Sequence, residues 1–94
     1  MLTLVIYDIS DNLERNHLIQ ALQHYGLHRI QKSAFLGNLN NFKRAELEEK
    51  VTEHLSGPKN SIYIVPICDK CRELTTIVSE EDIMLEDAKN YQIL

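Results

Sequence analysis

The sequence has few cysteines and few glycines, two and three among its 94 residues, and it contains no low-complexity run. Two cysteines, Cys68 and Cys71, are too few for a disulfide framework and are consistent with a reducing compartment. The apolar start, residues 1–7, lacks the basic flank and the length of a secretory signal, and no segment approaches the roughly 20 apolar residues of a membrane span. We therefore expect a cytoplasmic protein without a membrane partner.

The charge balance argues at first against nucleic acid, because the formal net charge is -4 and phosphate binding draws on Lys and Arg. The distribution points the other way, since no carboxylate occurs between Arg15 and Arg44. That stretch also holds cations and imidazoles, namely Arg29, Lys32, Lys43, His17, His24 and His28. A phosphate-binding surface and an ordinary solvated face both fit this pattern.

The first half of the chain predicts a strand followed by a helix. Residues 2–7 form a continuous apolar run that is typical of a strand buried on both faces. Asp11 and Glu14 have the spacing of a capping box, and Leu18 and Leu22 continue with helical periodicity. Gly26 is expected to end this helix.

Alternation over residues 28–36 predicts a second strand, which places Arg29, Ser33 and Phe35 on one face. The spacing of Leu47, Val51 and Leu55 predicts a second helix that the following Gly-Pro pair ends. Residues 61–65 predict a third strand, with Pro66 as its end, and residues 74–78 a further one.

These elements predict an α+β, ferredoxin-like βαββαβ domain over residues 1–78, with an antiparallel four-stranded sheet and both helices on one face. Residues 79–94 are expected to form an acidic tail. Two helices cover one face, yet the first and third strands are apolar on both, so something else must cover the open face. A second copy about a two-fold axis is favoured, with a terminal strand of the tail contributing to the dimer. A monomer whose tail folds back over the sheet is the alternative.

Asp8 carries the most specific chemical signal, because it places a carboxylate at the end of a strand buried on both faces. Such a group must be hydrogen-bonded, paired or bound to a metal. It either caps the following turn or, if a dimer axis passes nearby, faces its own copy. Two facing carboxylates would suit a hard divalent cation such as Mg2+.

The pair Cys68 and Cys71 has the spacing of half a zinc site, but no second Cys/His pair lies near it in the sequence. A redox role would require a helix start that lowers a thiol pKa, which Pro66 and the following polar residues do not clearly supply. We therefore interpret the two cysteines as small residues in a turn.

Three short motifs resemble the CRISPR-associated protein two family. They are YDISD at residues 7–11 followed by Arg15, GLHRIQKSAFLG at residues 26–37, and IVPICDKC at residues 64–71. The resemblance covers about residues 2 to 78 and implies a ferredoxin-like homodimer with Mg2+ or Mn2+ held at the aspartates across the interface. It also implies a part in spacer acquisition with the CRISPR integrase, or cleavage of RNA or duplex DNA.

Carried over by position, the resemblance makes Asp8 the metal ligand and a catalytic residue together with Arg15 and Arg29. The predicted nucleic-acid contacts are Tyr7, Ser10, His17, Lys32, Ser33 and Phe35. At His17 some members carry an arginine, and a histidine is only partly charged at neutral pH. For Phe35, packing in a dimer competes with stacking on a base.

Two functions follow from these expectations. In the first, Mg2+ at Asp8 activates water while Arg15 or Arg29 stabilises the developing charge, so the protein is a metal-dependent endonuclease. In the second, the protein is a non-catalytic DNA-binding scaffold of the integration complex. A small-molecule regulatory domain on the same fold lacks support, because the sequence has no glycine-rich ligand loop.

Overall fold

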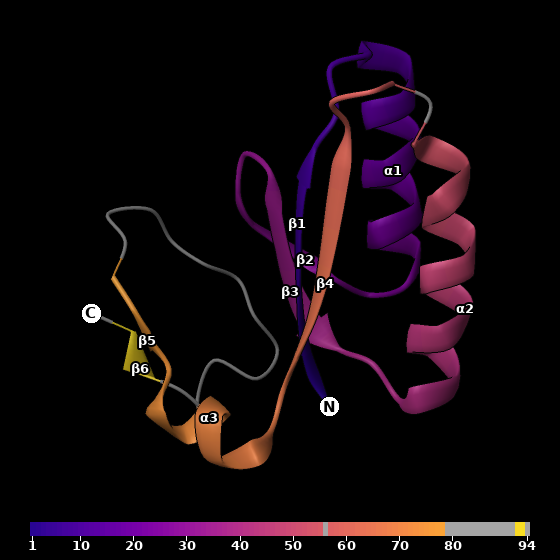
Figure 1. Cartoon of the computed structure of the whole chain (residues 1–94). Helices are drawn as coiled ribbons and strands as arrows, with labels where there is room; N and C mark the ends of the chain where they lie inside the picture. The colour runs from indigo at the N-terminus through magenta and orange to yellow at the C-terminus, as the bar shows by residue number, and fades with distance from the viewer. Residues whose placement is uncertain (56, 79–91, 94) are drawn as a thin grey trace.

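A computed structural model describes residues 1–55, 57–78, 92 and 93. The elements follow the order β1 (Leu2–Asp8), α1 (Asn12–His24), β2 (His28–Gln31), β3 (Ala34–Asn38), α2 (Asn41–Val51), a 3-10 helix (Thr52–His54), β4 (Ser61–Ile67), α3 (Asp69–Leu74), β5 (Thr76–Ile77) and β6 (Gln92–Ile93). Figure 1 shows α1 and α2 together on one side of the main sheet and α3, β5 and β6 on the other.

The main sheet has the strand order β2-β3-β1-β4, and every neighbouring pair is antiparallel. β1 therefore lies inside the sheet, between β3 and β4. This arrangement confirms the predicted ferredoxin-like α+β fold.

The prediction of one strand over residues 28–36 is wrong, because this segment is the hairpin of β2 and β3. Gln31 lies opposite Ala34, and Lys32 and Ser33 form the turn between them. Arg29 lies opposite Phe35, so these two residues do share a face, as cross-strand neighbours. Ser33 belongs to the turn and not to that face.

The end of the sheet also differs from the prediction. β4 runs through Pro66 to Ile67, and a proline is tolerated there because β4 is an edge strand. The predicted strand over residues 74–78 is replaced by the end of α3 and the short β5, which pairs in parallel with β6 in a separate sheet. The fourth strand of the main sheet is therefore β4.

The helix ends follow local chemistry. The Asp11 carboxylate accepts a hydrogen bond from the Glu14 N–H at 2.8 Å, as the capping motif predicts. Gly26, with φ of 84°, follows α1 in the left-handed conformation that favours glycine. The second helix is shorter than predicted: α2 ends at Val51, the 3-10 helix ends at His54, and Leu55 is exposed.

The main core lies between the sheet and the two long helices. Its buried residues include Leu18 and Leu22 from α1, Leu47 and Val51 from α2, and Val5, Tyr7 and Phe35 from the sheet. Both helices thus cover the same face, as predicted, and odd-numbered β1 side chains point into this core.

The open face of the sheet is covered over one half. Leu2 and Leu36 are buried there, and Ile77 from β5 packs against them. Ile6 and Tyr63, which are opposite each other in the register, remain 43% and 61% exposed. Among the described residues, β5 therefore covers the end of the face at Leu2, and the end nearest Asp8 is exposed.

The predicted acidic tail, residues 79–94, lies outside the described residues except for β6. That short strand pairs with β5 of the same chain. In the part of the chain that the structure describes, no helix has the length and apolar character needed to cross a membrane.

We predict that Leu22→Ala lowers the free energy of unfolding by about 2–5 kcal/mol, because Leu22 is fully buried between α1 and the sheet. Leu13→Ala on the same helix is the matched control, since Leu13 is 65% exposed and its loss should cost less than about 0.5 kcal/mol. Urea unfolding followed by circular dichroism measures both. Equal losses in the two variants would contradict this account of the core.

Candidate metal and nucleic-acid site

The carboxylate of Asp8 lies at the open end of the sheet. Asp8 is the last residue of β1, is exposed, and is opposite Ser61, the first residue of β4. The side chain that caps α1 is that of Asp11, and within residues 1–55, 57–78, 92 and 93 the Asp8 carboxylate accepts no hydrogen bond. Asp8 is thus a free anionic group on the same face as Ile6.

Two loops are fixed beside this strand end. The Asn60 side-chain oxygen accepts hydrogen bonds from the Ser10 N–H at 3.2 Å and the Ser10 hydroxyl at 3.4 Å. The sequence analysis did not identify Asn60, because no local pattern indicates a hydrogen bond to a residue fifty positions away. Ser10, predicted as a nucleic-acid contact, is exposed and in addition joins the loop after β1 to the start of β4.

Arg15 fixes the same loop from the first turn of α1. Its Nη1 donates to the Ile9 carbonyl at 3.1 Å, and its Nη2 donates to the Asn12 side-chain oxygen. A guanidinium has five N–H donors, so these two bonds leave donors for an anion. Arg15 is half-buried, with its orientation set by the backbone that follows Asp8.

The turn between β2 and β3 lies against β1 at the same end. The Tyr7 N–H donates to the Ser33 carbonyl at 3.0 Å. The Lys32 carbonyl accepts both the Tyr7 hydroxyl at 3.0 Å and the Arg29 Nη2 at 2.8 Å. Lys32 and Ser33 are exposed, so the turn presents an ammonium and a hydroxyl beside the end of β1.

Tyr7 and Phe35, both predicted as nucleic-acid contacts, have buried side chains that are 2% and 0% exposed. Their rings pack together in the core with centroids 6.3 Å apart. Phe35 faces the helices and so packs inside one chain, neither stacked on a base nor on the open face. The Arg29 guanidinium lies 5.9 Å from the Phe35 ring centroid, which positions Arg29 at the edge of the sheet.

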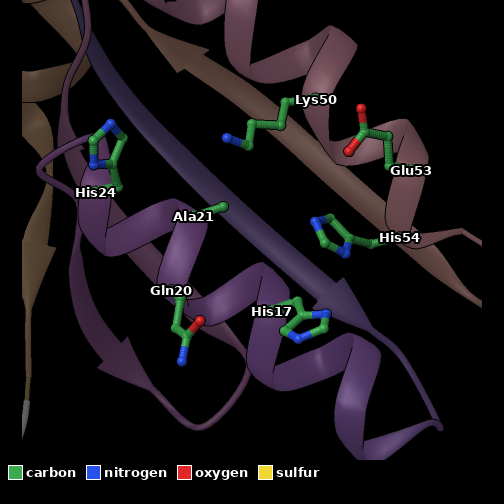
Figure 2. A pocket seen from close by; sticks show the side chains of 7 residues that line it. All are labelled: His17, Gln20, Ala21, His24, Lys50, Glu53 and His54. Atoms are coloured by element: carbon green, nitrogen blue, oxygen red, sulfur yellow. The ribbon is translucent and has the colours of Figure 1, made fainter.

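His17 belongs to a different surface. It lines a shallow hollow of about 310 Å3 between α1, the end of α2 and the 3-10 helix. Figure 2 shows the rings of His17 and His54 at the same end of this hollow. The two ring centroids are 6.4 Å apart. The other lining residues are Gln20, Ala21, His24, Lys50 and Glu53. The structure therefore groups His17 with His54 and Lys50.

The donor atoms at Asp8 fit half of a Mg2+ site. Among the described residues, no three His, Cys, Asp or Glu side chains lie together in a way that could hold a metal ion. Mg2+ binds through one or two carboxylates and keeps several waters, so one exposed carboxylate per chain suits a site completed by a second one. Cys68 and Cys71 follow β4 at its other end, and within the described ranges no third metal ligand lies with them.

The structure thus brings together Asp8, Ser10, Arg15, Lys32 and Ser33 at one end of the sheet, with Arg29 behind the turn. Arg29 and Lys32 also line a shallow hollow of about 370 Å3 at that edge. Cations and hydroxyls beside a free carboxylate are the groups that a phosphodiester and its metal ion require.

Known proteins are similar to this chain in sequence and fold. The family described as CRISPR associated protein Cas2 matches residues 1–75. The CRISPR-associated endoribonuclease Cas2 1 of Archaeoglobus fulgidus is 35% identical over 94 residues, which is 100% of both chains. A CRISPR-associated endonuclease Cas1/endonuclease Cas2 fusion of Thermoproteus tenax is 36% identical over 67 residues, 71% of this chain and 25% of that protein. Streptococcus pyogenes Cas2 at pH 6.5 superposes with a TM-score of 0.68 over 80% of this chain and 95% of its own, at 19% identity, and so supports the fold.

We predict that Tyr7→Phe lowers the free energy of unfolding by about 1 kcal/mol, because it removes the hydrogen bond from the buried hydroxyl to the Lys32 carbonyl. Tyr63→Phe is the matched control: Tyr63 is 61% exposed, and its variant should unfold as the parent protein does. Urea unfolding measures both. A Tyr7→Phe protein of unchanged stability that binds RNA or DNA less tightly would restore the original interpretation of Tyr7 as a nucleic-acid contact.

Proposed function

This chain belongs to the Cas2 family of CRISPR-associated proteins, and on that premise we propose that it is a metal-dependent endonuclease of CRISPR spacer acquisition. The observation that carries the proposal is the exposed carboxylate of Asp8, which has no partner among the described residues and lies at the uncovered end of an apolar sheet face. Its substrate is RNA or duplex DNA, and the name of the Archaeoglobus fulgidus relative, an endoribonuclease, favours RNA.

The working form is a homodimer joined through the open half of the sheet. Ile6, Tyr63 and Val65 are exposed there at 43%, 61% and 41%, and large apolar side chains gathered on one sheet face favour association. Ile6 and Asp8 share a face of β1, because side chains two residues apart point the same way. A two-fold axis across this patch brings the two Asp8 carboxylates toward each other.

The metal would be Mg2+ or Mn2+, with the Asp8 carboxylates of both chains as its protein ligands. When bound, it supplies a Lewis acid for the phosphate and a more acidic water. A divalent cation would also reduce the repulsion between two Asp8 carboxylates brought together in the dimer.

The surrounding side chains bind and orient the phosphodiester. Arg15 is anchored through two of its donors, and its remaining N–H groups stabilise negative charge that develops on the phosphate. Arg29 contributes a second guanidinium from β2, anchored through the Lys32 carbonyl. The Ser33 hydroxyl donates a hydrogen bond to a phosphate oxygen, and the Ser10 hydroxyl does so in exchange for its bond to Asn60. The Lys32 ammonium attracts the backbone of the nucleic acid.

A second function is supported by separate observations. Among the described residues Asp8 is a single carboxylate at this site, which makes a sparse catalytic centre, and the Thermoproteus tenax protein is named as a Cas1/Cas2 fusion. In this alternative the dimer is a DNA-binding scaffold for the CRISPR integrase and does not cleave. His17, in the hollow with Lys50 and two further histidines, then contributes phosphate contacts on the helical side.

We predict that Asp8→Asn lowers the rate of Mg2+-dependent RNA cleavage at least about a hundredfold, because the amide is a neutral and weaker metal ligand. Asp69→Asn is the matched control. Asp69 follows β4 at the end opposite to Asp8, so its variant should cleave at the parental rate. Radiolabelled RNA and duplex DNA, each with Mg2+, with Mn2+ and with EDTA, measure the rates.

Cleavage by Asp8→Asn at the parental rate would remove Asp8 from the mechanism. If the parent protein cleaves neither substrate, yet binds duplex DNA with an affinity that falls steeply with salt, the scaffold function is the correct one.

We predict that Tyr63→Arg shifts the protein from dimer to monomer, because it places two like charges in the proposed interface. Phe42→Arg is the control, since Phe42 is 74% exposed on α2, away from the open face, and its variant should remain a dimer. Sedimentation velocity over a range of protein concentrations distinguishes the two states. A monomeric parent protein, or a Tyr63→Arg variant that dimerises as tightly as the parent, would contradict the proposed interface.

A further inference from the structure

The segment after β4 contains two cysteines that the proposed nuclease does not use. Cys68 is the residue directly before α3, in extended backbone with φ of -68° and ψ of 165°, and Cys71 is the third residue of that helix. The sequence did not predict this helix, and the absence of a clear helix start was the reason for setting a redox role aside. The structure corrects that argument.

The first turn of α3 holds the two cysteines close together. The Arg72 N–H donates to the Cys68 carbonyl at 2.9 Å, which closes a helical turn around Cys71. The Thr75 hydroxyl donates to the Cys71 carbonyl at 2.7 Å and so fixes the backbone on the other side. Residues three apart in such a turn lie on the same side of the helix, so the two thiols are neighbours.

Both thiols are accessible. Cys68 and Cys71 are free cysteines, and both are exposed. α3 lies on the side of the main sheet away from α1 and α2, outside the main core (Figure 1). A small disulfide in solution therefore reaches either sulfur without unfolding the protein.

The two thiols differ in ionisation. The Cys71 N–H and the Cys71 thiol, followed by the Lys70 N–H, stabilise negative charge on the Cys68 sulfur and lower the pKa of Cys68, although partial desolvation and the Asp69 carboxylate oppose them. The same contact raises the pKa of Cys71, because its thiol donates a hydrogen bond to the Cys68 sulfur and a charged Cys68 would repel a second thiolate. Cys68 is thus the better nucleophile and Cys71 the residue that holds its proton.

We propose that Cys68 and Cys71 form a redox-active dithiol, which exchanges with small disulfides and closes reversibly into an intrachain disulfide. The spacing of the two cysteines, their place in one helical turn and their exposure carry this proposal. It does not depend on the nuclease or on the dimer.

The exchange proceeds in two balanced steps. The Cys68 thiolate attacks one sulfur of glutathione disulfide, forms a bond to it and releases one glutathione thiolate. Cys71 then loses its proton to solvent, attacks the Cys68 sulfur and releases the second glutathione thiolate. The protein loses two electrons and two protons, and glutathione disulfide takes up both electrons to become two glutathione molecules.

The test incubates the reduced full-length protein with glutathione disulfide near neutral pH and follows its intact mass under non-reducing conditions. The expected product has lost two hydrogens, carries no glutathione and has the mass of a single chain, and dithiothreitol reverses it. Peptide mapping is expected to place the disulfide between Cys68 and Cys71. A product that carries stable glutathione, or that consists only of disulfide-linked chains, would overturn the proposal.

Two single variants identify the attacking sulfur. Cys71→Ser is expected to accumulate a glutathione adduct on Cys68, because the resolving thiol is missing. Cys68→Ser is the matched control, and its adduct on Cys71 is expected to form at least severalfold more slowly. Equal adduct rates in the two variants would overturn the assignment of Cys68 as the nucleophile.

Discussion

The four-stranded sheet is apolar on both faces, while α1 and α2 cover only one of them. The proposed site at Asp8 depends on how the second face is covered. Burial of one apolar side chain contributes about 1.5–3 kcal/mol to the free energy of folding. A small domain is only marginally stable, so an apolar sheet face left in water costs a large part of its stability. Ile77 and the segment after β4 cover the end of the face around Leu2 and Leu36. At the remaining end Ile6 and Tyr63 are exposed, and the proposed dimer would cover them there.

Because this cover is partial, the Asp8 side chain remains exposed at the open end of the face. The alternation of β1 sends Tyr7 into the core, where it holds the turn at Lys32, and leaves Asp8 outside with Ile6. The proposal of a cation shared by two chains depends on this apolar patch beside an exposed carboxylate. The buried face thus builds the framework, through Tyr7 and Phe35, and the open face carries the exposed Asp8 carboxylate on which the proposed chemistry depends.

Local signals in the sequence predicted much of the fold. The cap at Asp11 and the helix end at Gly26 depend on neighbouring residues, and both were predicted. The hairpin was missed because Lys32 and Ser33 carry no Gly, Asn or Pro to mark a turn, so the alternation over residues 28–36 looked continuous. The long-range contacts could not be predicted from local patterns. The hydrogen bond between Ser10 and Asn60 and the packing of Ile77 on Leu2 and Leu36 have no local sequence signature. The family resemblance identified Asp8 as a candidate ligand, and the structure added that its carboxylate has no partner in the described part of the chain.

The central claim is that Asp8 contributes half of a metal site that two chains share. Isothermal titration of the metal-free protein with Mn2+ tests it most directly, because the stoichiometry separates a shared site from a site within one chain. The account predicts one Mn2+ bound for every two chains, and no binding at that site in Asp8→Asn. One Mn2+ bound by each chain, or unchanged binding in the variant, would contradict it.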